Sequence, residues 1–394
     1  MKDSLSPRSF VASHLVDIPR SGIRDFFDIV SARKDVISLG IGEPDFVTPW
    51  HIRESSIYAL DRGATAYTAN LGLLELRQEL ARYVQKAYGA TYNPATEILV
   101  TVGVSEALDL AIRAVVEPGD EVLYHEPCYV SYGPLVTFVH GKAVPVRTRQ
   151  EDDFRLTREA LEKTVTPRTK VLLLNFPTNP TGAVLNRDDV ADIARFAVEH
   201  DLLVITDEIY SELTYDVERV SIAAAPGMKE RTIFLHGFSK AWAMTGFRVG
   251  YACSTPELTE TMMKIHQYTM LCAPILSQKA AITALRDGLP DTAEMCAEYR
   301  RRRNFIHGAL NEMGLRCHFP RGAFYAFPFI GNCGLSSRDF ALRLLDEEKV
   351  ACVPGTAFGP SGEGYLRCSY ATDMELIREA MKRMAAFVKR LAKR

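Results

Sequence analysis

A lysine and an arginine eight residues apart could together bind a phosphorylated aldehyde. Lys240 follows the apolar, strand-like segment 232–235, so its amine is expected to lie in a pocket rather than in open solvent. Burial disfavours the ammonium form, which makes the amine a better nucleophile towards an aldehyde. Arg248 could hold a phosphate with its guanidinium fork. Taken alone, the pair is more often a surface lysine and a structural arginine, because isolated motifs give false positives.

Two further segments carry groups that suit a phosphate and a ring nitrogen. Gly103, Val104 and Ser105 lie where a predicted strand passes into a helix, and free N–H groups at a helix start can bind an anion. The alternative is an ordinary helix capped by Ser105. Asp207 ends the strand-like segment 203–206, and ligands of open α/β sheets bind at the carboxyl ends of strands. Its carboxylate could pair with a protonated pyridine nitrogen, or it could be a helix N-cap.

Four other side chains could complete a site for a flat, phosphorylated ring. Tyr210 could reach a phenolic ring oxygen, and Asn179, in a turn with two prolines, could donate to the same oxygen. Tyr129 could stack on the ring, and Arg367 could bind a substrate carboxylate through two parallel hydrogen bonds. The alternatives are a rigid loop for Asn179, a core aromatic for Tyr129 and a surface ion pair for Arg367. In combination, these motifs suggest pyridoxal phosphate.

Short apolar segments rich in β-branched residues could position these groups. They alternate with amphipathic stretches such as 105–116 and 187–200, which predicts an α/β fold with a mostly parallel seven-stranded sheet covered on both faces. No crossover helix fits between the last two segments, so they should pair antiparallel. The predicted strands are 97–102, 121–125, 143–148, 170–175, 202–206, 232–236 and 249–253.

The chain changes in character after about residue 286, which predicts a second, smaller α+β domain. A long charged helix at 291–313 opens it and a helix at 374–393 closes it. The first 45 residues are expected to pack with it, since a proline and a glycine-containing loop interrupt the chain there. We therefore expect a large domain at 46–285 and a small domain formed by 1–45 and 286–394.

Composition excludes several classes of protein. The 394 residues are 47% hydrophobic and 24% charged with a net charge of −2, which argues against a nucleic-acid binder. The N-terminus carries no signal-peptide pattern and no segment is apolar enough to span a membrane, so a cytoplasmic protein is expected. Eight cysteines without a CxxC pair and nine histidines without ligand spacing give no metal site.

These motifs resemble the class I/II aminotransferases, which are pyridoxal-phosphate enzymes of fold type I. The resemblance runs from the segment 38–45 to Arg367 and is strongest to the aromatic and broad-specificity aminotransferases of archaea and bacteria. It implies that Lys240 binds the cofactor aldehyde as a Schiff base and later moves a proton, while Asp207 pairs with the ring nitrogen. It further implies contacts of Asn179 and Tyr210 with the phenolic oxygen, stacking by Tyr129, and a phosphate site lined by Gly103, Val104, Ser105, Ser239 and Arg248.

The resemblance also assigns the substrate and a partner subunit. Arg367 would bind the α-carboxylate of the substrate, helped by Asn179 and by the backbone around Gly42. Tyr67 matches a tyrosine that reaches the phosphate of the other subunit, which implies a homodimer with shared active sites. Gly237 departs from the family, which often has a serine there that contacts the phosphate. Aspartate-using relatives carry a lysine in place of Ser105.

The expected activity is transfer of the amino group of an L-amino acid, aromatic or of broad specificity, to a 2-oxo acid such as 2-oxoglutarate, with ping-pong kinetics. Two alternatives use the same scaffold: a C–S β-lyase and an aminotransferase of the aspartate or alanine type. A ligand-sensing regulator is disfavoured, because about 35 residues precede the first motif and leave no room for a helix-turn-helix module.

Overall fold

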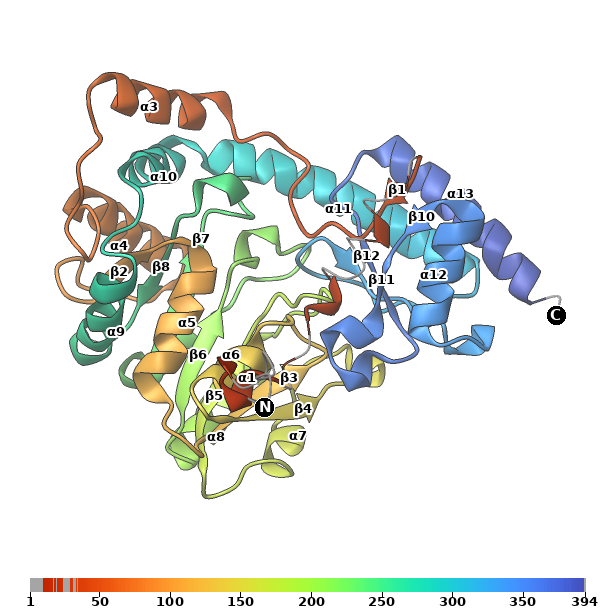
Figure 1. The fold of residues 1–394 in the computed structure, drawn as a ribbon, viewed down its shortest axis with the longest axis horizontal. Coiled ribbons are helices and arrows are strands. Elements are labelled where there is room, and N and C mark those ends of the chain that lie inside the picture. The colour runs from red at the N-terminus through yellow and green to blue at the C-terminus, as the bar shows by residue number, and fades with distance from the viewer. Residues whose placement is uncertain are drawn as a thin grey trace, which may run out of the picture.

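The computed structural model describes residues 10–16, 18, 20–23, 29–30, 33 and 35–392. The remaining positions of the predicted 1–45 segment lie outside the described residues. The described chain forms a large sheet flanked by helices, with a group of shorter strands and three long helices formed by the C-terminal residues (Figure 1).

A seven-stranded sheet forms the centre of the larger part of the described chain. Its strand order is β2-β8-β7-β6-β5-β3-β4. All neighbouring pairs are parallel except those of β8, which is antiparallel to both β2 and β7. The mostly parallel sheet and the antiparallel last pair are therefore confirmed, with every strand end within one residue of its predicted position. The strands are β2 (Ile98–Thr101), β3 (Glu121–Glu126), β4 (Lys142–Arg147), β5 (Thr169–Leu174), β6 (Leu203–Asp207), β7 (Thr232–Gly237) and β8 (Gly250–Cys253).

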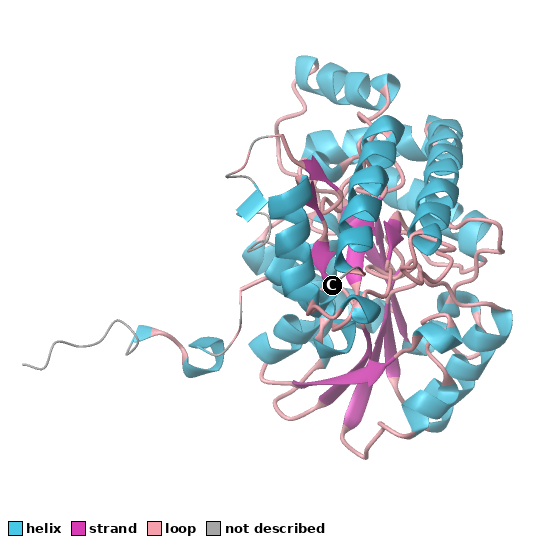
Figure 2. Ribbon diagram, turned by 90° about the vertical axis from the view of Figure 1, so that its right-hand side faces the viewer, coloured by secondary structure: helices cyan, strands magenta, loops and turns pink. Residues whose placement is uncertain are grey.

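Alternate residues of the central strands enter two different cores, because side chains of a strand point to opposite faces. Leu172 and Leu174 of β5 pack in the core that includes α8, whereas Val171 and Leu173 pack in the core that includes α5. Helices therefore cover both faces of the sheet, as Figure 2 shows. The helices of this part are α3 (Trp50–Asp61), α4 (Leu74–Tyr88), α5 (Gly103–Val115), α6 (Tyr132–Phe138), α7 (Arg158–Glu162), α8 (Arg187–Glu199), α9 (Pro256–Thr269) and α10 (Ile275–Asp287).

The C-terminal part has its own small sheets. β9 (Tyr325–Ala326) and β11 (Val353–Pro354) flank β12 (Leu366–Ser369) in an antiparallel arrangement, and β1 (Ile37–Ser38) pairs in parallel with β10 (Val350–Ala351). The pairing of β1 places an N-terminal segment against the C-terminal part. It supports the division into 46–285 and 1–45 plus 286–394, which stays a prediction. The other helices are α1 (Ser13–Val16), α11 (Leu289–Glu312), α12 (Ser337–Glu348) and α13 (Met374–Leu391).

No helix among the described residues has the length and apolar character that a membrane crossing requires. Within the same ranges, no cluster of three or more histidine, cysteine or acidic side chains could hold a metal ion.

Candidate active site

A cavity of about 580 Å³ opens where the carboxyl ends of β5, β6 and β7 meet residues of the C-terminal part. Side chains that follow these strands line it, and so do residues far away in the sequence. Eleven of the residues selected from sequence lie in its wall, whereas Gly103 lies directly behind Arg248 and Tyr67 lies outside it. The eleven are Gly42, Val104, Ser105, Tyr129, Asn179, Asp207, Tyr210, Ser239, Lys240, Arg248 and Arg367.

Lys240 lies just beyond β7 with its amine inside the cavity. Its Nζ donates a hydrogen bond of 2.6 Å to the carbonyl oxygen of Gly42. Burial lowers the pKa of Lys240 to about 8, and the positive charges of Arg367 and Arg248 act in the same direction, while the carboxylate of Glu43 opposes them. A larger fraction of the amine is therefore neutral near pH 8 than for an exposed lysine, as a nucleophile towards an aldehyde requires.

The start of α5 lies beside Arg248 at one end of the cavity. Gly103 has φ +77°, and a Cβ placed there would lie only 2.5 Å from Nη2 of Arg248. Because glycine has no Cβ, the helix start and the guanidinium can lie close together, as an anion site requires. The interpretation of Ser105 as the helix cap is wrong: α5 begins at Gly103, two residues earlier than predicted, so Ser105 lies in its first turn.

Close packing explains why position 237 holds a glycine and not the serine expected from the resemblance. A Cβ on Gly237 would lie 2.9 Å from Cγ2 of Val104 and 3.0 Å from Cα of Gly250. Both distances are shorter than ordinary carbon contacts, so β7, β8 and the start of α5 pack too closely for any side chain there. This packing excludes the serine hydroxyl that the resemblance led us to expect at this position.

Asp207 is a buried carboxylate at the end of β6. Its Oδ2 accepts a hydrogen bond of 2.9 Å from the Tyr132 hydroxyl, and its Oδ1 accepts one of 3.2 Å from the backbone N–H of Ile209. Burial raises the pKa of Asp207 to about 6, although these two hydrogen bonds act against the rise. The alternative of a helix N-cap is wrong, since the carboxylate serves a local turn and no α-helix follows it. A positively charged ring N–H beside it would favour the ionised form.

Arg367 is 1% exposed, which excludes the surface ion pair considered from sequence. Its Nη1 donates to Oδ1 of Asn179 at 3.0 Å and its Nη2 donates to the carbonyl oxygen of Gly40 at 2.5 Å. Its Nε has no hydrogen-bond partner, and no carboxylate is among its partners in the described chain. A buried guanidinium in this state can still bind a carboxylate that enters the cavity.

Two tyrosines complete the wall beside Arg367. The hydroxyl of Tyr210 lies 2.9 Å from that of Tyr325, and the guanidinium of Arg367 lies 4.5 Å from the centre of the Tyr325 ring. Tyr129 also lines the cavity and packs edge-on against Tyr132 at 5.8 Å between ring centres.

Sequence reasoning missed several wall residues, among them Tyr132, Asn175, Glu43 and Tyr325. Tyr132 and Asn175 could have been found from their positions, three residues after Tyr129 and directly after β5. Asn175 donates from Nδ2 to the carbonyl oxygen of Asp207 at 2.8 Å and so holds the end of β6 in place. No comparable signal points to Tyr325, which lies in another part of the sequence.

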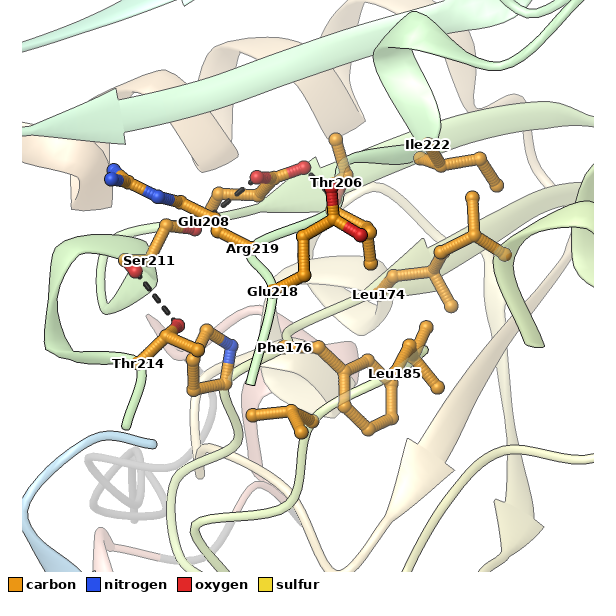
Figure 3. A pocket seen from close by; sticks show the side chains of 14 residues that line it. Leu174, Phe176, Leu185, Thr206, Glu208, Ser211, Thr214, Glu218, Arg219 and Ile222 are labelled. Atoms are coloured by element: carbon orange, nitrogen blue, oxygen red, sulfur yellow. Dashed lines mark hydrogen bonds between the residues drawn. The ribbon is translucent and has the colours of Figure 1, made fainter. Parts of the chain in front are cut away.

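A separate hollow of about 30 Å³ lies near Glu208 and shares no lining residue with the large cavity (Figure 3). The Glu208 carboxylate accepts hydrogen bonds from the hydroxyls of Thr206, Ser211 and Ser221. Burial raises its pKa to about 7. The hollow has room for about one water molecule, so it is too small for a substrate.

Comparison with known proteins identifies the family. The family model for aminotransferase class I and II matches residues 34–384. The chain belongs to the class I and II aminotransferases. It is 52% identical over 380 residues to a putative aminotransferase of Bacillus subtilis, covering 96% of this chain and 98% of that protein. An aspartate aminotransferase of Pyrococcus abyssi is 49% identical, covering 92% and 94%.

A solved structure of an aromatic aminotransferase from Pyrococcus horikoshii superposes with a TM-score of 0.89 at 47% identity, covering 93% of this aminotransferase and 99% of that chain. The fold is therefore fold type I, as expected from sequence. Members of this family use pyridoxal 5′-phosphate.

The residues of this aminotransferase fit that cofactor. The close approach of Gly103 to Arg248 places the N–H groups of a helix start beside a guanidinium, an arrangement that suits a phosphate. The buried Asp207 carboxylate lacks a cationic hydrogen-bond partner in the described chain, and the lysine amine has a lowered pKa. Together they offer an acceptor for a ring N–H and a nucleophile for an aldehyde.

Proposed function

We propose that this aminotransferase uses aromatic and other apolar L-amino acids as donors and a 2-oxo acid as acceptor. The observation that carries the proposal is the charge of the cavity wall. Among its described lining residues the cations are Lys240, Arg248 and Arg367. In the proposed arrangement, each of the three would bind the cofactor or the substrate α-carboxylate. An aspartate side chain would bring a second carboxylate without a matching cation, which costs free energy in a buried site.

The apolar part of the wall suits such a donor. Ile23, Ile41, Leu108 and Val130 line the cavity together with the Tyr129 ring. These side chains can bury an aromatic or aliphatic group by contact with apolar surface. The relatives described above include both an aspartate and an aromatic aminotransferase at similar identity. The apolar donor is therefore favoured by the chemistry of the cavity wall and not by sequence similarity.

We propose the following roles for the site residues. The N–H groups at Gly103, Val104 and Ser105 would hold the cofactor phosphate with Ser239 and Arg248. Asp207 would hold the ring nitrogen, Asn179 and Tyr210 the ring oxygen, and Tyr129 one ring face, as the positions of these side chains around the cavity permit.

The protein groups would then act on the substrate in a defined order. Arg367 and Asn179 would bind the α-carboxylate and orient the substrate, so that the Cα–H bond faces Lys240. The bound cofactor supplies an electron-withdrawing ring that stabilises negative charge at the substrate α-carbon. Nζ of Lys240 would accept the proton from that carbon and donate it one step later to the cofactor carbon that carried the aldehyde, which its lowered pKa favours.

The donor panel tests the substrate class. We expect kcat/KM for phenylalanine and tyrosine to exceed that for aspartate by about tenfold or more, because the aspartate side chain would leave a charge unpaired. Ser105→Lys should narrow this ratio by adding a cation to the cavity wall. Equal or better use of aspartate by the unmodified enzyme would refute the apolar donor class. Release of pyruvate and ammonia from cysteine without an acceptor would favour a lyase instead.

We also propose that the enzyme is a homodimer in which Tyr67 enters the partner's site. Large aromatic side chains are exposed on α3, on α9 and in the loop between α3 and α4: Trp50 is 57%, Tyr268 86% and Tyr67 82% exposed. Tyrosine and tryptophan are enriched at protein interfaces, which supports a subunit contact that involves these elements. Sedimentation equilibrium should give about twice the 44.0 kDa of one chain. A monomer with full activity would contradict the shared site.

A further inference from the structure

Tyr325 connects the two parts of the chain inside the cavity. It lies in β9, where its backbone pairs with Ser369 of β12, two residues beyond Arg367. The side chain is 1% exposed and belongs to the core of the C-terminal part. The Tyr325 hydroxyl lies 2.9 Å from the hydroxyl of Tyr210, and Tyr210 follows β6 of the large sheet.

The Tyr325 hydroxyl has Tyr210 as its hydrogen-bond partner in the described chain. Burial raises the pKa of both hydroxyls, so both keep their protons at neutral pH. A hydroxyl has one proton to donate. If Tyr210 directs its proton at the cofactor's ring oxygen, its own oxygen is left to accept, and Tyr325 must be the donor.

The position of Arg367 strengthens Tyr325 as a donor. Its guanidinium lies 4.5 Å above the centre of the Tyr325 ring. A positive charge over an aromatic face withdraws electron density, and the charge of Arg367 acts to lower the pKa of the Tyr325 hydroxyl against the effect of burial. A more acidic hydroxyl makes a stronger hydrogen bond to the oxygen of Tyr210. The Tyr210 hydroxyl is then polarised towards its own acceptor.

We propose that Tyr325 is a positioning residue that donates a hydrogen bond to Tyr210 and, through it, sets the acidity of the bound cofactor. The inference rests on the proposed role of Tyr210 at the ring oxygen. A donor to that oxygen stabilises its negative charge and so lowers the pH at which the cofactor–lysine link loses its proton. Because Tyr325 also supports Arg367, the same side chain would couple the substrate carboxylate site to the acidity of the cofactor.

The test is a pH titration of the visible absorption of the cofactor-loaded protein, with no substrate present. Tyr325→Phe should move the midpoint upward by between a few tenths of a unit and about one unit, the size of one neutral hydrogen bond. Tyr210→Phe should move it upward further. The double variant should match Tyr210→Phe alone, because Tyr325 acts only through Tyr210.

Tyr370→Phe is the matched control. Tyr370 is buried in the same core and donates to the carbonyl oxygen of Ala323, but it does not line the cavity. Its removal should leave the midpoint unchanged even if it lowers the melting temperature. This control separates a loss of stability from the loss of the relay, by which we mean the hydrogen bond from Tyr325 to Tyr210 and its effect on the cofactor.

The possible failures are distinguishable. No shift in Tyr210→Phe would show that Tyr210 does not act on the cofactor, which removes the premise and the relay together. A shift in Tyr210→Phe with none in Tyr325→Phe would overturn the relay and leave the proposed role of Tyr210 intact. An additional shift from Tyr325→Phe in the Tyr210→Phe background would also overturn it, since Tyr325 would then act by another route.

Discussion

Lys240→Ala is expected to lower kcat for amino transfer by about 10⁴-fold, while the protein still takes up the cofactor. With the roles proposed for Lys240, the variant would lose both the nucleophile for the aldehyde and the base for the α-proton, and a positioned base alone contributes about 10²–10⁴-fold. The other contacts around the cavity, at Arg248, Asp207 and the start of α5, are unchanged, so cofactor binding is weakened and not abolished. Steady-state kinetics and equilibrium dialysis of the cofactor measure the two effects.

An exposed lysine provides the control. Lys264→Ala truncates another lysine, which is exposed on α9 and does not line the cavity. It should leave kcat within about twofold of that of the unmodified enzyme. Added methylamine can supply a free amine to the space left by Lys240→Ala and should recover part of the rate. Turnover of Lys240→Ala at the level of the Lys264→Ala control would contradict the assigned role of Lys240.

The second large effect is expected for Asp207→Asn, which should lower kcat by about 10- to 100-fold. The substitution keeps the size of the side chain but removes its negative charge. A charge-assisted hydrogen bond contributes roughly 1.5–3 kcal/mol, and each 1.36 kcal/mol of barrier is tenfold in rate. Without the carboxylate the ring nitrogen is less often protonated, so the ring stabilises negative charge at the substrate α-carbon less well.

Tyr132→Phe separates the charge of Asp207 from its positioning. The Tyr132 hydroxyl donates to Oδ2 of Asp207 at 2.9 Å, and its removal leaves the carboxylate and its charge in place. We expect a loss in kcat of about tenfold at most, since one neutral donor to a buried acceptor is lost. Equal losses in Tyr132→Phe and Asp207→Asn would show that orientation, and not charge, is what Asp207 contributes.

The strands of the large sheet could be predicted well, because the pattern that indicates each strand lies within the strand's own residues. Each strand is a short apolar segment buried on both faces, and Val171 to Leu174 show why: successive side chains enter different cores, so both must be apolar. The positions of Asp207, at the end of β6, and of Lys240, just beyond β7, could also be predicted. Chain position alone places both residues at the carboxyl edge of the sheet.

What could not be predicted depends on contacts between distant segments. Tyr325 meets Tyr210 across 115 positions, and Asn179 meets Arg367 across 188. No periodicity or spacing encodes such pairs, because they follow from how the C-terminal part packs on the sheet. The start of α5 was misplaced for a local reason: Ser105 is a good capping residue, but the glycine before it adopts a positive φ and lets the helix begin at Gly103.

Chemical trapping can show directly whether Lys240 is the residue that bonds the cofactor. The loaded protein is reduced with borohydride, digested, and its peptides are analysed by mass spectrometry. We expect one cofactor-modified peptide, which contains Lys240, and loss of that peptide when phenylalanine is added before reduction. A label on another lysine, or a protein that carries no reducible cofactor, would refute the proposed role of Lys240.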